Sequence, residues 1–325
     1  MSELILASSM RKSFKGVPVV DDVSLRVNAG EIYGLVGADG AGKTTTIRLL
    51  CGALKPDGGT ISVAGYDVGS QAEQAHQQIG YLSQRFSLYE DLTVLENIRF
   101  FAEVRGLKSN EWYPRSMEIL GFVGLAEFKD RFAGQLSGGM KQKLGLATAL
   151  VVQPRVFLFD EPTTGVDPVT RQDFWQLIIS LVNNQHELNT EKVAVLISTP
   201  YMDEAARCHR IGFMHHGRII AEGTPGELRS LLSGRILELT GHPLPLLKQI
   251  VRELPVVEDA HAFGDCLHIH FKQQIRRDVI PLLEKYIRGK GAVFTHAREI
   301  PPVLEDVFIA LADGESQQIG ESQHA

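Results

Sequence analysis

Residues 37–44 read Gly-Ala-Asp-Gly-Ala-Gly-Lys-Thr and match the pattern G-x-x-x-x-G-K-[ST]. The apolar run Ile32 to Val36 precedes them, and the helix-forming stretch Lys43 to Leu50 follows them. A glycine-rich loop between a strand and a helix lets backbone N–H groups converge on phosphate oxygens, and the helix N-terminus adds partial positive charge. The stretch therefore predicts a phosphate-binding loop, against the alternative of a glycine-rich turn that binds nothing.

The side chains of this loop predict a magnesium-bound nucleotide. Lys43 is expected to bridge the β- and γ-phosphates, the Thr44 hydroxyl to ligate Mg²⁺, and Thr45 to contact the α-phosphate. A GTPase would also need an Asn-Lys-x-Asp segment that reads the base, and the sequence contains none. The nucleotide-binding residues predicted in this loop are Gly37, Ala38, Asp39, Gly40, Ala41, Gly42, Lys43, Thr44 and Thr45.

Two further motifs follow along the chain. Leu136-Ser-Gly-Gly-Met-Lys-Gln142 opens a stretch with apolar residues at helical spacing. Val156-Phe-Leu-Phe-Asp160 reads as a buried strand that ends in two carboxylates, Asp160 and Glu161. Carboxylates at the carboxyl end of such a strand suit a Mg²⁺-nucleotide site. We expect Asp160 to hold the metal shell and Glu161 to polarise the attacking water.

Together these motifs resemble the ATP-binding cassette family, the nucleotide-binding domains of ABC transporters, over residues 1 to about 225. The resemblance implies an α/β fold: a P-loop NTPase (RecA-like) core with an antiparallel β-subdomain and an inserted α-helical subdomain at about residues 90–152. It also implies ATP and Mg²⁺ as ligands and a head-to-tail dimer. In such a dimer a signature segment of one chain caps the γ-phosphate on the other. The signature residues are Leu136, Ser137, Gly138 and Gly139.

The resemblance assigns further positions one at a time. Phe14 stands where the family stacks an aromatic ring on adenine, although a plain core phenylalanine is the alternative. Gln84 matches the residue that contacts Mg²⁺ and the water, against a surface glutamine. Asp167 matches an aspartate at the dimer interface. Asp39 replaces a commoner asparagine, but its backbone N–H is the expected contact.

One departure from the family pattern concerns catalysis. The family places a histidine on the γ-phosphate after a strand that ends in Ser-Thr, and here Pro200 takes that position. Proline has neither a side-chain donor nor a backbone N–H. His209, His215 and His216 are poorly spaced to replace it. Losing one donor aimed at developing charge costs ~10²–10³ in rate, so we expect slow ATP hydrolysis.

The chain length predicts more than one domain. Residues 1–228 form the expected nucleotide-binding domain, and residues 229–312 carry the order β-α-β-β-α-β of a ferredoxin-like unit. Residues 313–325 are polar and predict a disordered tail. The segment Val303 to Ala310 is similar to the closing stretch of ATPase subunits in drug- and polysaccharide-type exporters, or it is simply an amphipathic helix.

Composition narrows the function classes. The net charge is -6, so no basic surplus indicates a nucleic-acid partner. No apolar run approaches the ~20 residues of a membrane span. We therefore expect a cytoplasmic protein, peripheral on the inner face of the cell membrane, that powers a separate integral membrane permease. A heterodimer with a second nucleotide-binding domain is favoured over a homodimer. A nucleotide-sensing regulatory subunit and a non-transport ABC ATPase are the alternatives.

Overall fold

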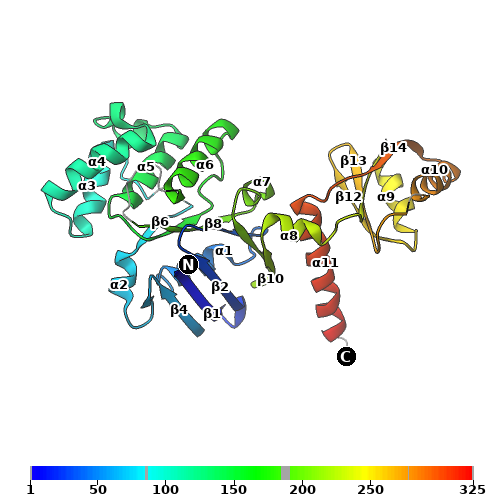
Figure 1. Ribbon diagram of the computed structural model, residues 1–325, viewed down its shortest axis with the longest axis horizontal. Helices are drawn as coiled ribbons and strands as arrows, with labels where there is room; N and C mark the ends of the chain where they lie inside the picture. Colours follow the sequence, from blue (N-terminus) through cyan, green and yellow to red (C-terminus); the bar gives the residue numbers. More distant parts are fainter. Residues whose placement is uncertain (1, 85–86, 184–190, 277, 324–325) are drawn as a thin grey trace. The chain divides into compact units, whose positions relative to one another are not determined.

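The computed structural model describes residues 2–84, 87–183, 191–276 and 278–323. The chain divides into two compact units, Met1–Glu222 and Gly223–Ala325. The sequence predicted the boundary a few residues later, at 228. In Figure 1 the first unit runs from blue to green and the second from yellow-green to red. Each unit has its own sheet system and its own core, so each is described by itself.

The central element of the first unit is a six-stranded sheet with the order β10-β9-β3-β8-β7-β6. Strand β3 pairs in parallel with both β8 and β9, and β7 pairs in parallel with β6 and β8. Every residue of β3, β7 and β8 is buried, as in a parallel sheet covered on both faces. The strands are β3 (Ile32–Val36), β6 (Ile79–Leu82), β7 (Val156–Asp160), β8 (Ala194–Thr199), β9 (Arg210–His215) and β10 (Arg218–Gly223).

A second, antiparallel sheet in the first unit has the order β2-β1-β4-β5. Helix α1 (Lys43–Leu50) contacts strands of both sheets, and Ile47, Leu49 and Leu50 are fully buried in their shared core. This packing fixes the start of α1, and with it the phosphate loop, at the carboxyl end of β3 in the central sheet. The strands are β1 (Glu3–Phe14), β2 (Val17–Asn28), β4 (Gly58–Val63) and β5 (Tyr66–Asp67).

Three helices that pack on one another lie between β6 and β7 in the chain and form the helical part of the first unit (Figure 1). They are α3 (Val94–Val104), α4 (Ser109–Val123) and α5 (Gly138–Leu150), accompanied by the short 3₁₀ turns η1 (Ala126–Phe128) and η2 (Ala133–Gln135). Thr93 and Glu96 form a capping box that starts α3. The remaining helices of this unit are α2 (Ala72–Gln77), α6 (Pro168–Val182) and α7 (Met202–Ala205).

The second unit has the order β-α-β-β-α-β around one antiparallel sheet, β12-β13-β11-β14. The third strand lies between the first two, as in a split βαβ, ferredoxin-like unit. Helices α9 and α10 bury Leu247 and Leu283 against Leu237 and Ile269 of the sheet. The elements are α8 (Pro225–Ser230), β11 (Ile236–His242), α9 (Leu244–Arg252), β12 (Val257–Phe263), β13 (Cys266–Phe271), α10 (Val279–Gly289), β14 (Val293–Glu299) and α11 (Leu304–Gln323).

The last helix differs from the prediction. We expected a disordered tail from residue 313, but α11 continues to Gln323; residues 324–325 lie outside the described part. The stretch 313–323 contains no proline and is rich in Glu and Gln, which are good helix formers. Polar composition alone therefore did not end the helix. Within the described ranges, no helix has both the length and the apolar character needed to cross a membrane.

Candidate nucleotide-binding site

The backbone of the phosphate loop depends on glycine at both of its ends. A Cβ at Gly37 would lie 2.2 Å from the Met214 carbonyl oxygen, and a Cβ at Gly42 would lie 2.5 Å from the Val19 carbonyl oxygen. Gly42 also has φ 107°, a conformation that side chains disfavour, and it is the N-cap of α1. Neighbouring backbone thus clamps the loop between β3 and α1, with Ala38, Asp39 and Gly40 at its exposed tip.

Lys43 points its ammonium group into this loop. Its Nζ donates to the carbonyl oxygens of Gly37 (2.8 Å) and Ala38 (3.0 Å). The same Nζ lies 3.1 Å from Glu161 Oε1, and both side chains are buried. The positive charge predicted to hold phosphate is therefore paired inside the protein with the carboxylate predicted to polarise water.

Asp160 lies beside the loop at the end of β7. Thr44 Oγ1 and Ser198 Oγ each donate to Asp160 Oδ1 at 2.9 Å. Burial raises the pKa of the Asp160 carboxyl above its usual value, despite these two hydrogen bonds. A desolvated carboxylate next to a threonine hydroxyl gives the hard oxygen ligands that Mg²⁺ prefers.

Glu161 occupies a constrained position just after β7. Its φ is 47°, and its N–H donates to the carbonyl oxygen (3.2 Å) and the Oγ (3.0 Å) of Ser198 on β8. Gln84 Nε2 donates to Glu161 Oε2 at 3.2 Å, and Thr164 Oγ1 contacts the same oxygen at 3.3 Å. The structure therefore brings Lys43, Glu161 and Gln84 into one hydrogen-bonded group.

The signature segment (residues 136–139) lies at the start of α5. Ser137 is the N-cap, and its Oγ accepts from the Met140 N–H at 3.3 Å. Leu136 is buried, whereas Ser137 and Gly138 are exposed. A Cβ at Gly139 would lie 2.1 Å from Thr170 Cγ2 of α6. The exposed start of a helix can offer backbone N–H groups to an anion.

Two further predicted residues lie on the surface of the first unit. Phe14, at the end of β1, is 44% exposed, so it is not the core phenylalanine that we weighed as the alternative. Lys12 Nζ lies 5.7 Å from the centre of its ring. Asp167 is the N-cap of α6 and accepts from the Thr170 N–H at 3.0 Å. This cap is a structural role that the resemblance alone did not indicate.

Pro200 follows β8 at the carboxyl edge of the sheet. The preceding residue, Thr199, accepts the Gly37 N–H on its carbonyl oxygen at 3.4 Å. A buried carboxylate that was not predicted from the sequence lies next to Thr199. Glu204 accepts hydrogen bonds from Thr163 Oγ1 (2.6 Å) and from Thr199 Oγ1 (2.7 Å). A carboxylate shortly after a strand that ends in Ser-Thr was the available signal.

The nearby histidines do not take the place of Pro200. His209 Nδ1 accepts from the N–H of Ile32, at the opposite end of β3. His215 is the last residue of β9 and His216 follows it, and β3 lies between β9 and β8 in the sheet. Two strand spacings, about 10 Å, therefore separate that turn from Pro200. The three residues that sequence analysis considered as replacements lie elsewhere.

Comparison with known proteins shows which family and fold the chain is similar to. The family model described as "ABC transporter" matches residues 20–164. The daunorubicin/doxorubicin resistance ATP-binding protein DrrA of Streptomyces peucetius is 39% identical over 73% of the chain and 70% of DrrA. The Nod factor export ATP-binding protein I of Cupriavidus metallidurans is 35% identical over 97% of the chain and 99% of its own length.

Another relative is longer than the chain. The Escherichia coli protein named "Probable multidrug ABC transporter ATP-binding protein YbhF" is 38% identical over 96% of the chain, which spans about half (52%) of that protein. Among solved structures, an ATP-binding subunit of an ABC transporter matches 70% of the chain and 92% of its own, with a TM-score of 0.62 and 30% identity. A nucleotide-free ATP-binding cassette matches 71% and 96%, with a TM-score of 0.64 and 27% identity.

Proposed function

The chain belongs to the ATP-binding proteins of ABC transporters, and from this premise we propose that it binds and hydrolyses ATP to drive export through a membrane permease. The observation that carries the proposal is the buried ion pair of Lys43 and Glu161 beside the glycine-clamped loop, to which the exposed Gln84 adds a hydrogen bond. Relatives named for multidrug transport, daunorubicin resistance and Nod factor export support the export direction.

The residues of the site divide the work between binding and chemistry. Lys43 exchanges its carbonyl and carboxylate partners for β- and γ-phosphate oxygens, and the amides of residues 37–42 complete the cradle. Glu161 then accepts a proton from the attacking water, which Gln84 orients. The exposed Phe14 ring stacks on the adenine.

The oxygen groups near the loop fit a magnesium ion. Thr44 Oγ1 lies 2.9 Å from Asp160 Oδ1. Gln84 is held nearby by its hydrogen bond to Glu161, the residue that follows Asp160. These are hard oxygen ligands, and a cation would offset the cost of burying the Asp160 carboxylate. Bound Mg²⁺ would neutralise charge on the β- and γ-phosphates. Thr44, Asp160 and Gln84 are the residues that we assign to it.

Hydrolysis in this chain's own site is slow. Pro200 follows Thr199, the residue of β8 that bonds the Gly37 N–H, and it offers no donor; the three nearby histidines lie elsewhere. The missing donor lowers the rate by ~10²–10³, because it would act on charge that develops only in the transition state. Since Glu161 is present, the site retains some turnover.

An asymmetric pair of nucleotide-binding domains would compensate for Pro200. The exposed Ser137 and Gly138 at the start of α5 can cap the γ-phosphate held by a second domain that has its own histidine. A heterodimer then contains one fast and one slow site, whereas a homodimer contains two slow sites. Residue 167 would lie at the interface between the domains. The assembly would work on the cytoplasmic side of the membrane permease.

A nucleotide-sensing regulatory subunit is the second candidate function, and Pro200 is the observation that favours it. In that case ATP binding persists, but turnover stays negligible even with partner domains present. With the permease and a second cassette present, a rate that Glu161→Gln lowers would come from this chain's own site and would exclude it.

The nucleotide assignment is tested by Lys43→Ala. Because the substitution removes charge-assisted hydrogen bonds worth ~1.5–3 kcal/mol, we expect Mg-ATP affinity to fall about 10–100-fold. Calorimetric titration of the full chain measures it. Lys55→Ala, an exposed lysine shortly after α1, is the matched control and should bind like wild type. Equal ATP affinity for Lys43→Ala and wild type would refute the site.

A further inference from the structure

The second unit carries polar side chains, of the types that ligate metals in proteins, on the sheet face opposite helices α9 and α10. Glu238 of β11 pairs with His268 of β13, and Thr240 pairs with Cys266. Side chains alternate between the two faces of a strand. Leu239 and its apolar neighbours enter the core under the helices, so Glu238, Cys266 and His268 share the other face.

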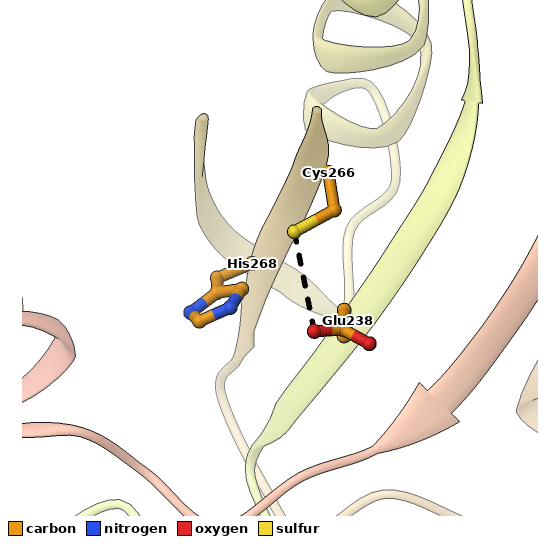
Figure 2. A group of neighbouring side chains, drawn as sticks. All are labelled: Glu238, Cys266 and His268. Carbon is orange, nitrogen blue, oxygen red and sulfur yellow. Dashed lines mark hydrogen bonds between the residues drawn. The ribbon is translucent and has the colours of Figure 1, made fainter. Parts of the chain in front are cut away.

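These three side chains converge on one point. Their ligand atoms all lie within 4.8 Å of one another, and Cys266 Sγ is 4.0 Å from Glu238 Oε2. Figure 2 shows the Cys266 and Glu238 side chains turned toward each other, with the His268 ring beside them. Ligand atoms around a tetrahedral zinc ion are about 3.5 Å apart. Small side-chain rotations would therefore bring the three atoms to bonding distance of one ion.

The second nitrogen of His268 is already held. His268 Nδ1 lies 2.8 Å from Asp306 Oδ1. Asp306 belongs to α11, and its carboxylate is fully buried. It also accepts from His270 Nε2 (3.2 Å) and from the Val303 N–H (3.0 Å). An imidazole whose Nδ1–H donates to a carboxylate presents Nε2 as a lone pair. Histidines that ligate metals almost always have such a carboxylate or carbonyl partner.

The other two ligands are also positioned from outside the cluster. Arg298 Nε donates to Glu238 Oε1 at 2.7 Å, which leaves Oε2 directed to Cys266. Burial, followed by the nearby Glu238 carboxylate, raises the pKa of the Cys266 thiol. Without a metal, the thiol proton therefore stays on sulfur, where the Phe263 carbonyl oxygen at 3.1 Å is a nearer acceptor than Glu238 Oε2 at 4.0 Å.

We propose that Glu238, Cys266 and His268 bind one divalent transition-metal ion, and the ligand chemistry favours zinc. Thiolate, imidazole and carboxylate together suit Zn²⁺ and not Mg²⁺ or Ca²⁺. Binding forms a sulfur–metal bond and releases the Cys266 proton to solvent. The site therefore loses the single charge of the proton and gains the two charges of the metal ion. Three protein ligands leave the fourth position for water. The site joins β11 and β13, and Asp306 links it to α11.

Cobalt titration of the full chain tests the proposal. Chelator-treated, untagged protein in a non-thiol reductant, without nucleotide, is titrated with Co²⁺. We expect a saturable thiolate-to-cobalt charge-transfer band at one ion per chain, which Zn²⁺ abolishes by displacement. Cobalt bound at the nucleotide site gives no such band, because the ligands there are oxygens.

Variants assign the band to this cluster. Cys266→Ser should eliminate it, whereas Cys51→Ser, a matched change of another free cysteine, should keep it. His261→Gln should also keep it, since His261 belongs to a separate group with Asp259 and Asp313. Asp306→Asn, which alters only the positioning residue, should weaken binding about 10–100-fold.

The outcomes that overturn the proposal are specific. They are the absence of a saturable band in wild type, a band that persists in Cys266→Ser, and a band lost in Cys51→Ser. Circular dichroism of the metal-free variants checks folding. If Cys266→Ser does not fold, Glu238→Gln replaces it, and wild-type affinity in Glu238→Gln would equally refute the site.

Discussion

Lys43 and Glu161 form a buried ion pair. A bound nucleotide must open this pair, because an N–H of Nζ that bonds the carboxylate cannot at the same time bond a phosphate oxygen. Breaking a buried pair is costly unless a new partner replaces the old one. In the proposed site the γ-phosphate is such a partner for Lys43. Its arrival frees Glu161 Oε1, while Gln84 and Thr164 still donate to Oε2. We propose that this exchange turns Glu161 into a base for water.

The variant Glu161→Gln separates binding from chemistry. Loss of the base should lower ATP turnover by ~10²–10³. ATP affinity should stay equal or rise, because the neutral amide competes less for Lys43. Parallel nucleotide titration and phosphate-release assays measure both, with the exposed Glu90→Gln as the control. Lost ATP binding together with lost turnover would contradict the division of roles between the two residues.

The sequence predicted single residues better than pairs. Lys43, Thr44 and Asp160 follow from local patterns, since a loop at a helix start and a carboxylate at a strand end have defined chemistry. The Lys43–Glu161 pair depends on β8 lying between β3 and β7, which no local pattern encodes. The bonds from Thr163 and Thr199 to Glu204 have the same origin.

At the scale of elements, α5 and α6 approach closely at Gly139. Gly139→Ala would place a methyl group 2.1 Å from Thr170 Cγ2. We expect a loss of ~1–3 kcal/mol in unfolding free energy. Gly138→Ala, whose Cβ meets nothing within 4 Å, should be neutral or slightly stabilising.

Adding Thr170→Ala to Gly139→Ala should recover part of the loss. It removes the clashing methyl and keeps the Asp167 cap on the Thr170 backbone N–H, but it loses the hydrogen bond of the Thr170 side chain to Asp167. Urea unfolding of wild type, Gly139→Ala, Thr170→Ala and the double variant measures the coupling between positions 139 and 170. Equal stability of Gly138→Ala and Gly139→Ala would show that α6 does not constrain the signature segment.

Element boundaries followed the sequence where turn residues mark them. The stretches Ile32–Val36, Lys43–Leu50 and Val156–Asp160 match β3, α1 and β7. The prediction was too short for α11. Gly314 and Gly320 follow residue 312, but no proline does, and the helix continues through both glycines.

At the scale of the whole molecule, the chain should associate with membranes only through its permease. Co-expression with its membrane permease should move the chain into the membrane fraction, and expression without the permease should leave it in the supernatant. The described residues contain no helix able to cross a membrane. Membrane binding without the permease, or none with it, would contradict the transporter assignment.

The order of elements in the second unit was predictable, whereas its polar sheet face was not. Alternating apolar residues predicted the ferredoxin-like order. That Asp306 would meet His268 and His270 depends on α11 folding back onto β13, a contact between distant segments. Glu238, Cys266 and His268 were therefore not among the residues predicted from the sequence.

The central claim is that a complete ATP site is slowed by a single missing donor at Pro200. Steady-state ATP turnover of the isolated full chain tests it most directly, in wild type, Pro200→His and Pro200→Ala. The alanine variant removes proline without adding a donor, so it controls for the backbone. We predict a ~10²-fold higher rate for Pro200→His, the low end of what one transition-state donor provides, and no increase for Pro200→Ala. Equal rates in all three proteins would contradict the account.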